Sequence, residues 1–216
     1  MQYARPLPEY LVTRYRGWKA TKYAEDKSWF KHLARDGQHP RAMVISCCDS
    51  RLHVTSIFGA DQGEFFIHRN IANLVPPFSP DGTYHGTSAA VEYSVTVLEV
   101  AHLVVLGHSN CGGVRSCLDM CAGNAPDLEE KSSFIGQWLN LLRPQAERIA
   151  GTEAPEQRQS ALEKQAVLVS LENLMTFPFV RAAVAAENLS LHGVWHDIGE
   201  GTLEVFDPQT GDFAPL

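Results

Sequence analysis

The sequence has no apolar run long enough to cross a membrane and no excess of basic charge. Its 216 residues carry 18 Lys and Arg against 25 Asp and Glu, which gives a formal net charge of −7. A protein that binds nucleic acid carries a basic stripe, and one that docks on anionic lipid is basic as well. No stretch of about 18 apolar residues is present to span a bilayer. We therefore expect neither nucleic acid nor a membrane as a partner.

Targeting and dividing segments are also missing from the sequence. The N-terminal segment lacks the apolar core and small-residue cleavage site of a secretory signal peptide, which makes the cytoplasm the expected compartment. There is no internal repeat, no low-complexity segment and no linker, and the stretch 76–86, rich in Pro and Gly, is expected to be a surface loop. We expect a single domain over 1–216, with a helical arm over 1–37.

A disulfide framework is not expected, because the five cysteines are odd in number and a reducing cytoplasm keeps thiols free. Cys47 and Cys48 are adjacent, whereas Cys111, Cys117 and Cys121 lie close together further along. Cys117 and Cys121 are one helical turn apart and are expected to pack in the core. The sequence has no CxxC pair of the kind that structural zinc sites use.

Apolar runs and helical spacing alternate along the chain. Buried strands are expected over residues 41–46, 64–68, 102–106, 189–195 and 202–206. Helices are expected over residues 8–37, 86–99, 112–120, 131–150 and about 156–187, the last of them broken or kinked near Pro178. This alternation indicates an α/β fold with a mostly parallel sheet and helices on both faces. Because only residues 196–201 separate the last two strands, we expect those two to be antiparallel.

Three candidate metal ligands directly follow two of these strands. Cys47 follows the first strand, and His108 and Cys111 follow the third. In an open α/β sheet, ligands gather at the carboxyl ends of the strands where the strand order reverses, so neighbouring strands would bring the three together. Two thiolates and one imidazole leave a tetrahedral metal one ligand short, which is typical of a catalytic zinc with an open position for water.

Two charged residues follow the first ligand at alternate positions. If the chain stays extended, Cys47, Asp49 and Arg51 lie on one face, because side chains alternate along a strand. Cys48 is then expected to point into the packing of the sheet as a small buried residue. Each Cys or His alone is more often structural, but Cys-x-Asp-x-Arg after one strand and His-x-x-Cys-Gly-Gly after another favour a functional site.

The sequence resembles the β-class carbonic anhydrases in four segments: SCCDSR (46–51), HRNIANLVPPF (68–78), AAVEY (89–93) and GHSNCGG (107–113). Element order and spacing match from about residue 14 to residue 206. The resemblance implies a four-stranded parallel sheet with an added antiparallel strand. It also implies that the N-terminal helices embrace a second subunit, so that the working unit is a homodimer or a dimer of dimers.

The resemblance also implies a reaction and a cofactor. One Zn²⁺ per chain would be held by Cys47, His108 and Cys111, and zinc-bound hydroxide would convert CO₂ to bicarbonate and a proton. The Asp49–Arg51 pair would orient that hydroxide. Asp49 would be a metal ligand only in an inactive form.

A substrate pocket is expected beside the metal. The resemblance places Phe66, Ile71 and Tyr93 around it, with Gln38 reaching in across the dimer interface. Gly112 and the glycine after it open a helix, where unpaired N–H groups favour an anion and a missing side chain allows close approach.

Two smaller features refine the expectation. A branch of the family that bicarbonate inhibits has Trp where this sequence has Val44, so we expect Asp49 off the zinc and no such inhibition. His53 is expected to be a solvated surface residue, with a role in proton transfer as the alternative.

Other functions remain open. Hydrolysis of carbonyl sulfide or carbon disulfide would use the same site on linear analogues of CO₂. A zinc-binding module without catalysis is the second alternative. A cysteine-dependent phosphatase is excluded, because it would need Arg where His53 follows Cys47 or where Cys117 follows Cys111.

Overall fold

The computed structural model describes residues 3–81 and 85–216. The chain divides into two compact units, Met1–His39 and Pro40–Leu216, and each is described by itself. Within the described residues no single helix has the length and apolar composition of a membrane span. One consecutive pair of helices reaches it only together, and the pair is bent by 88°.

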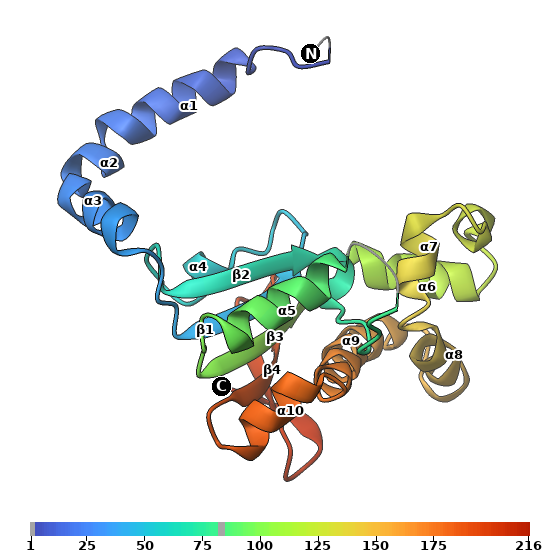
Figure 1. The fold of residues 1–216 in the computed structure, drawn as a ribbon. Helices are drawn as coiled ribbons and strands as arrows, with labels where there is room; N and C mark the ends of the chain where they lie inside the picture. The colour runs from blue at the N-terminus through green and yellow to red at the C-terminus, as the bar shows by residue number, and fades with distance from the viewer. Residues whose placement is uncertain (1–2, 82–84) are drawn as a thin grey trace. The chain divides into compact units, whose positions relative to one another are not determined.

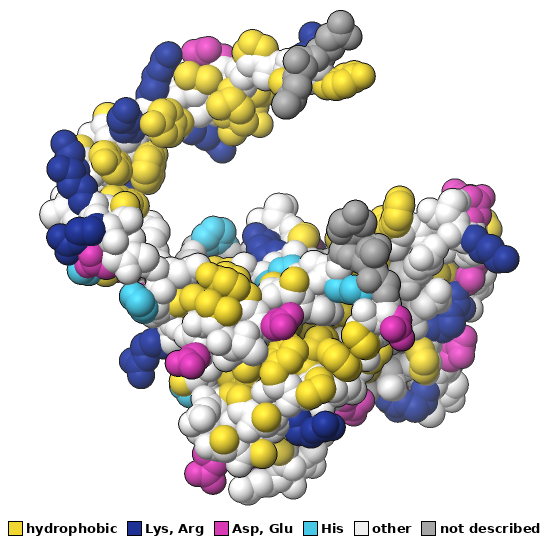
Figure 2. Space-filling view, in the orientation of Figure 1, with side chains coloured by type: hydrophobic (Ala, Val, Ile, Leu, Met, Phe, Trp, Pro, Cys, Tyr) yellow, Lys and Arg dark blue, Asp and Glu magenta, His cyan; other side chains and the backbone are white. Residues whose placement is uncertain are grey.

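The N-terminal unit consists of helices α1 (Glu9–Ala20), α2 (Lys22–Glu25) and α3 (Lys27–Asp36). The continuous helix expected over 8–37 is therefore interrupted, first at Thr21, whose side-chain hydroxyl donates to the carbonyl of Gly17. None of the residues in these helices is buried. Hydrophobic side chains lie exposed along them beside Lys and Arg (Figure 2).

The second unit is built on one six-stranded sheet in the order β2-β1-β3-β4-β5-β6 (Figure 1). Its strands are β1 (Ala42–Cys47), β2 (Phe65–Asn70), β3 (His102–His108), β4 (Ser190–His196), β5 (Leu203–Asp207) and β6 (Asp212–Pro215). The first four strands in this order are parallel, and β5 and β6 are antiparallel to their neighbours. The expected parallel sheet with its antiparallel strand is confirmed, and β6 adds a second antiparallel strand.

Helices pack around this sheet and bury two cores. Helices α5 (Gly86–Thr96), α9 (Arg158–Leu174) and α10 (Pro178–Ala185) form one core with alternate strand residues such as Ile45 and Val105 (Figure 1). The other core includes residues of α6 (Gly112–Cys121), α7 (Phe134–Leu139) and α8 (Arg143–Thr152). Every residue of β1 is buried, as expected for a central parallel strand.

Two expected helices are broken by proline. The helix expected over 131–150 is divided into α7 and α8, and Pro144 lies in the first turn of α8. The helix expected over 156–187 ends before Pro178, which begins α10, so of the two expected alternatives the break is confirmed and the kink is not. Proline lacks an amide proton and is tolerated in the first turn but not inside a helix.

Two short elements, α4 (Val54–Ile57) and the 3₁₀ turn η1 (Ile71–Asn73), lie near the carboxyl end of the sheet.

Candidate metal centre

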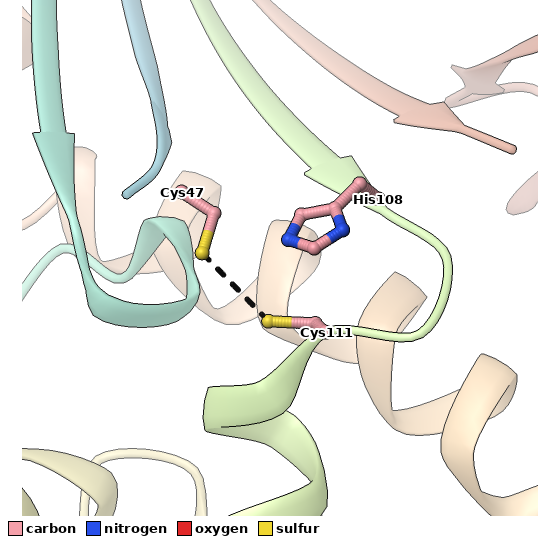
Figure 3. A group of neighbouring side chains, drawn as sticks. All are labelled: Cys47, His108 and Cys111. Carbon is pink, nitrogen blue, oxygen red and sulfur yellow. Dashed lines mark hydrogen bonds between the residues drawn. The ribbon is translucent and has the colours of Figure 1, made fainter. Parts of the chain in front are cut away.

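The carboxyl ends of β1 and β3 bring together three side chains from separate parts of the sequence. Cys47 is the last residue of β1 and His108 the last of β3, and the two strands pair directly in parallel. Cys111 follows a short turn and precedes the first residue of α6 as its N-cap. Figure 3 shows the three side chains pointing toward one another. The expected convergence of the two loops is confirmed.

The donor atoms of this cluster have the spacing of a metal site. The two sulfur atoms of Cys47 and Cys111 are 3.8 Å apart, and all three donor atoms lie within 4.8 Å of one another. Two zinc–sulfur bonds of about 2.3 Å at a tetrahedral angle would separate the sulfur atoms by about 3.8 Å as well. Among the described residues this is the one group of three or more Cys, His, Asp or Glu with such spacing.

One ring nitrogen of His108 has no hydrogen-bond partner among the described residues, and a bound metal would be its partner instead. The ring is buried, and Nδ1 lies 2.9 Å from the carbonyl oxygen of Ser109, to which it donates. Nε2 is buried with no hydrogen-bond partner. A buried polar atom without a partner is costly, and a metal ligand of this kind normally donates its other N–H to a carbonyl group. His108 is therefore prepared to ligate through Nε2.

Electrostatics within the cluster favours ionisation of Cys47 and opposes that of Cys111. The hydrogen bond from the Cys111 thiol lowers the pKa of Cys47 and burial opposes this effect, while the neighbouring His108 ring and the backbone N–H groups of Asp49 and Ala72 lower the pKa further. The Cys47 thiolate and burial in turn raise the pKa of Cys111. Burial lowers the pKa of His108, but the neighbouring Cys47 thiolate, the Ser109 carbonyl and the charge of Asp49 together outweigh burial and raise it. A dication would relieve the repulsion that prevents both thiols from ionising together.

Asp49 and Arg51 form a bidentate ion pair beside the cluster. Nε and an Nη of Arg51 donate to the two oxygens of Asp49 at 2.9 and 2.7 Å. This pairing holds the pKa of Asp49 well below its usual range. One Asp49 oxygen lies 4.0 Å from Nε2 of His108, and Arg51 also donates to the carbonyl of Asn110. The pair thus connects the loop after β1 to the loop after β3.

Comparison with known proteins identifies the family of this site. The carbonic anhydrase family model matches residues 42–203. Beta carbonic anhydrase 3 of Arabidopsis thaliana is 37% identical over 194 residues, which are 88% of this chain and 73% of the relative. The chloroplastic beta carbonic anhydrase 5 of the same plant is 34% identical, and the chain spans 65% of its length. The chain belongs to the β-class carbonic anhydrase family.

Solved structures agree with this assignment. The β-carbonic anhydrase CcaA superposes with a TM-score of 0.87 at 28% identity, covering 96% of this chain and 91% of its own. A tetrameric β-carbonic anhydrase of Sordaria macrospora superposes with a TM-score of 0.76 at 31% identity, covering 95% and 98% of the two chains. The expected family resemblance and fold are both confirmed.

The expected environment of Cys48 was wrong. This side chain is exposed rather than packed into the sheet. The reason is that β1 ends at Cys47, and the chain turns at residues 50 and 51 instead of remaining extended. Asp49 and Arg51 therefore meet through this turn, in which the backbone N–H of Arg51 also donates to Asp49. The expected packing of Cys117 and Cys121 is confirmed, since both lie in or against one core.

Residues expected around the substrate are divided between two places. Ile71 lines a mostly apolar cavity of about 520 Å³ together with Cys48 and Trp138. Phe66 and Tyr93 contact each other with ring centroids 5.8 Å apart, but they do not line that cavity. Gln38 belongs to the N-terminal unit. The roles of these residues in substrate binding stay predictions.

The two glycines after Cys111 differ in what they permit. A side chain at Gly112 would meet no other atom within 4 Å, whereas a Cβ at Gly113 would lie 2.7 Å from a methyl carbon of Ile71. Gly113 thus permits a close approach of α6 to η1, and the expected role of Gly112 in substrate binding stays a prediction. Val44 is buried in the core, and His53 is exposed as expected.

Two supporting residues were not found from the sequence. Arg69 of β2 donates to the carbonyl groups of Cys47, Asp49 and Leu52, and so holds the loop after β1. Glu163 of α9 is buried and accepts a hydrogen bond from the backbone N–H of Cys111. Arg69 lies in the segment 68–78, near the end of an expected strand, and a basic residue at that position was the one sign in the sequence of a supporting role. Glu163 had no such signal, because its neighbours read as an ordinary helix.

Replacement of a donor residue should abolish metal retention. We expect His108→Ala to lose most of its bound metal on dialysis, because two thiols alone leave half of a tetrahedral shell unfilled. Cys48→Ala is the matched control and should keep one metal ion per chain, since Cys48 is exposed and is not one of the three clustered donors. Elemental analysis of the purified variants checks both outcomes. Equal metal content in the two variants would contradict this assignment.

Proposed function

We propose that this protein binds one zinc ion through Cys47, His108 and Cys111 and catalyses the reversible hydration of CO₂ to bicarbonate and a proton. The observation that carries the proposal is the three-donor cluster beside a fixed Asp49–Arg51 pair in a β-class carbonic anhydrase fold. Zinc, when bound there, supplies a Lewis acid that activates a water molecule near neutral pH.

Asp49 would orient the attacking water. Both of its oxygens accept from Arg51, so the carboxylate is fixed and remains ionised. Oδ1 accepts from both Nε and the backbone N–H of Arg51, whereas Oδ2 accepts one bond and keeps a further lone pair. Its distance of 4.0 Å from Nε2 of His108 puts it next to the donor cluster. A hydrogen bond from water to this carboxylate would direct a free lone pair of the water oxygen at the carbon of CO₂. The proton released with bicarbonate would leave to buffer.

The charge of the metal ligands explains why the attacking water needs Asp49 as well as zinc. Two thiolates neutralise the charge of a dication, so water is acidified less than it would be with neutral ligands. A fixed acceptor such as Asp49 compensates through geometry. Because Arg51 occupies both carboxylate oxygens, Asp49 is restrained from moving onto the metal. This arrangement supports the prediction from Val44 that Asp49 stays off the zinc.

Two alternative functions remain: hydrolysis of a linear CO₂ analogue at the same site, and zinc binding without catalysis. Carbonyl sulfide and carbon disulfide are linear like CO₂ and would meet the same water and the same carboxylate, so relative rates on the three substrates decide between them. A zinc-binding module without catalysis would not depend on the charge of Asp49. The family assignment favours CO₂ over both alternatives.

Asp49→Asn should therefore abolish turnover without loss of metal. The amide places a donor where a carboxylate oxygen accepted, so we expect CO₂ hydration to fall roughly 10²- to 10³-fold, the usual cost of one misplaced hydrogen bond in an active site. Stopped-flow hydration with a pH indicator measures the rate, and elemental analysis measures the zinc. Asp61→Asn, at an exposed position, is the matched control. Full activity of the Asp49 variant would exclude the proposed role.

We also propose that the working unit is a homo-oligomer, a dimer or a dimer of dimers. The N-terminal helices bury no residue, and Tyr10, Leu11 and Trp18 lie exposed along them. Isolated helices of this length are marginal in water without packing partners. The tetrameric relative from Sordaria macrospora supports a second copy of this chain as that partner.

Loss of the exposed apolar residues should shift the assembly toward monomer. We expect the double variant Tyr10→Ser, Leu11→Ser to sediment as a smaller species than the wild type, because apolar contact area drives most stable association. Arg16→Ser on the same helix tests for a general effect of altering the arm. Analytical ultracentrifugation at micromolar concentration makes the comparison. A wild-type chain that sediments as a monomer would contradict the proposal.

A further inference from the structure

A buried carboxylate lies directly behind the Cys111 loop. Glu163 is on α9, and only 2% of it is exposed. Its neighbours in the same helix, such as Leu162 and Ala166, belong to the core. Glutamate is almost never fully buried unless its charge is satisfied by specific partners. The position of Glu163 therefore needs a reason beyond packing.

Three N–H donors satisfy this carboxylate. The backbone N–H of Cys111 donates to Oε1 at 2.9 Å, and the side-chain amide of Gln159 donates to the same oxygen at 3.1 Å. The indole N–H of Trp195 donates to Oε2 at 3.3 Å. Both oxygens are thus used, and the three donors come from the metal loop, from α9 itself and from β4.

The Cys111 loop depends on such external contacts. Between the end of β3 and the start of α6 the chain passes through Asn110, which has φ of 55° in the left-handed region. Cys111 is the N-cap of α6, but its side chain makes no capping hydrogen bond. Ser109 is held at the other end of the turn, where its backbone N–H donates to the carbonyl of His196 at 2.9 Å. Glu163 fixes the backbone of the ligand residue itself.

We propose that Glu163 is a positioning residue that holds Cys111 in place for the metal, so that its loss loosens the metal site specifically. The proposal rests on the zinc site proposed above. A charged acceptor makes a stronger and shorter hydrogen bond to N–H than a neutral one, which suits the fixing of one ligand backbone. Replacement of residues that orient metal ligands typically costs about 10- to 100-fold in metal affinity.

The test is the rate of zinc release from the loaded full-length protein to a chromophoric chelator. Glu163→Gln keeps the shape of the side chain but has one accepting oxygen in place of two. Three N–H donors converge on this side chain, so the N–H₂ group of the glutamine must face at least one of them. We expect zinc release roughly 10- to 100-fold faster than from the wild type. Adding Trp195→Phe removes one of the N–H groups that compete for the single amide oxygen, which can then accept from Cys111. The double variant should therefore release zinc more slowly than Glu163→Gln alone.

A control separates positioning from general stability. Arg158→Met, at the start of α9, removes the guanidinium bonds to the carbonyls of Ala150 and Glu153 and leaves the three donors to Glu163 unchanged. It should lower the unfolding midpoint and leave zinc release unchanged. Glu163→Asp keeps the charge but withdraws it by one methylene, and provides the same test if the Gln variant does not fold. Its zinc release should also be faster.

Three results overturn the proposal. They are wild-type release rates in folded Glu163 variants, equal acceleration by Arg158→Met, and a double variant no slower than Glu163→Gln. A wild-type chain that holds no zinc overturns it together with the metal site. A wild-type chain that holds zinc but does not hydrate CO₂ overturns only the proposed function, and the release experiment still decides the role of Glu163.

Discussion

The parallel pairing of β1 with β3 is the constraint on which the site depends. It aligns Ser46 with Leu106, so both strands end at the same edge and present Cys47 and His108 side by side. Separation of these strands by another would move the two ligands apart by the spacing of an inserted strand. The buried apolar residues of both strands therefore define the position of the metal as well as the core.

Two buried thiols and a buried imidazole oppose this arrangement when no cation is present. Cys47 and Cys111 cannot both ionise at a separation of 3.8 Å without a compensating charge. Two hydrogen bonds fix the backbone of the loop after β3, one from Arg51 to the carbonyl of Asn110 and one from the N–H of Cys111 to Glu163. These bonds help to fix the ligand geometry, and a bound dication would relieve the repulsion between the two sulfur atoms.

Most of the fold and the three metal ligands could be predicted from short stretches of sequence. The reason is that each buried strand is an apolar run, and the ligands stand at its end or within a few residues after it. The four-residue strand β6, with Phe213 as its one large apolar residue, carried too little periodicity to be found. Cys48 was misplaced because alternation was extended past the end of β1 into a turn. Glu163 was missed because its partner Cys111 is distant in the sequence, and only packing of α9 brings the two together.

The central claim is that this chain is a zinc-dependent CO₂ hydratase. The most direct measurement combines elemental analysis of the purified protein with stopped-flow CO₂ hydration across a range of pH. The account predicts one zinc per chain and a hydration rate that rises with pH as the activated water loses its proton. A well-folded protein that holds no metal and leaves the uncatalysed hydration rate unchanged would contradict it.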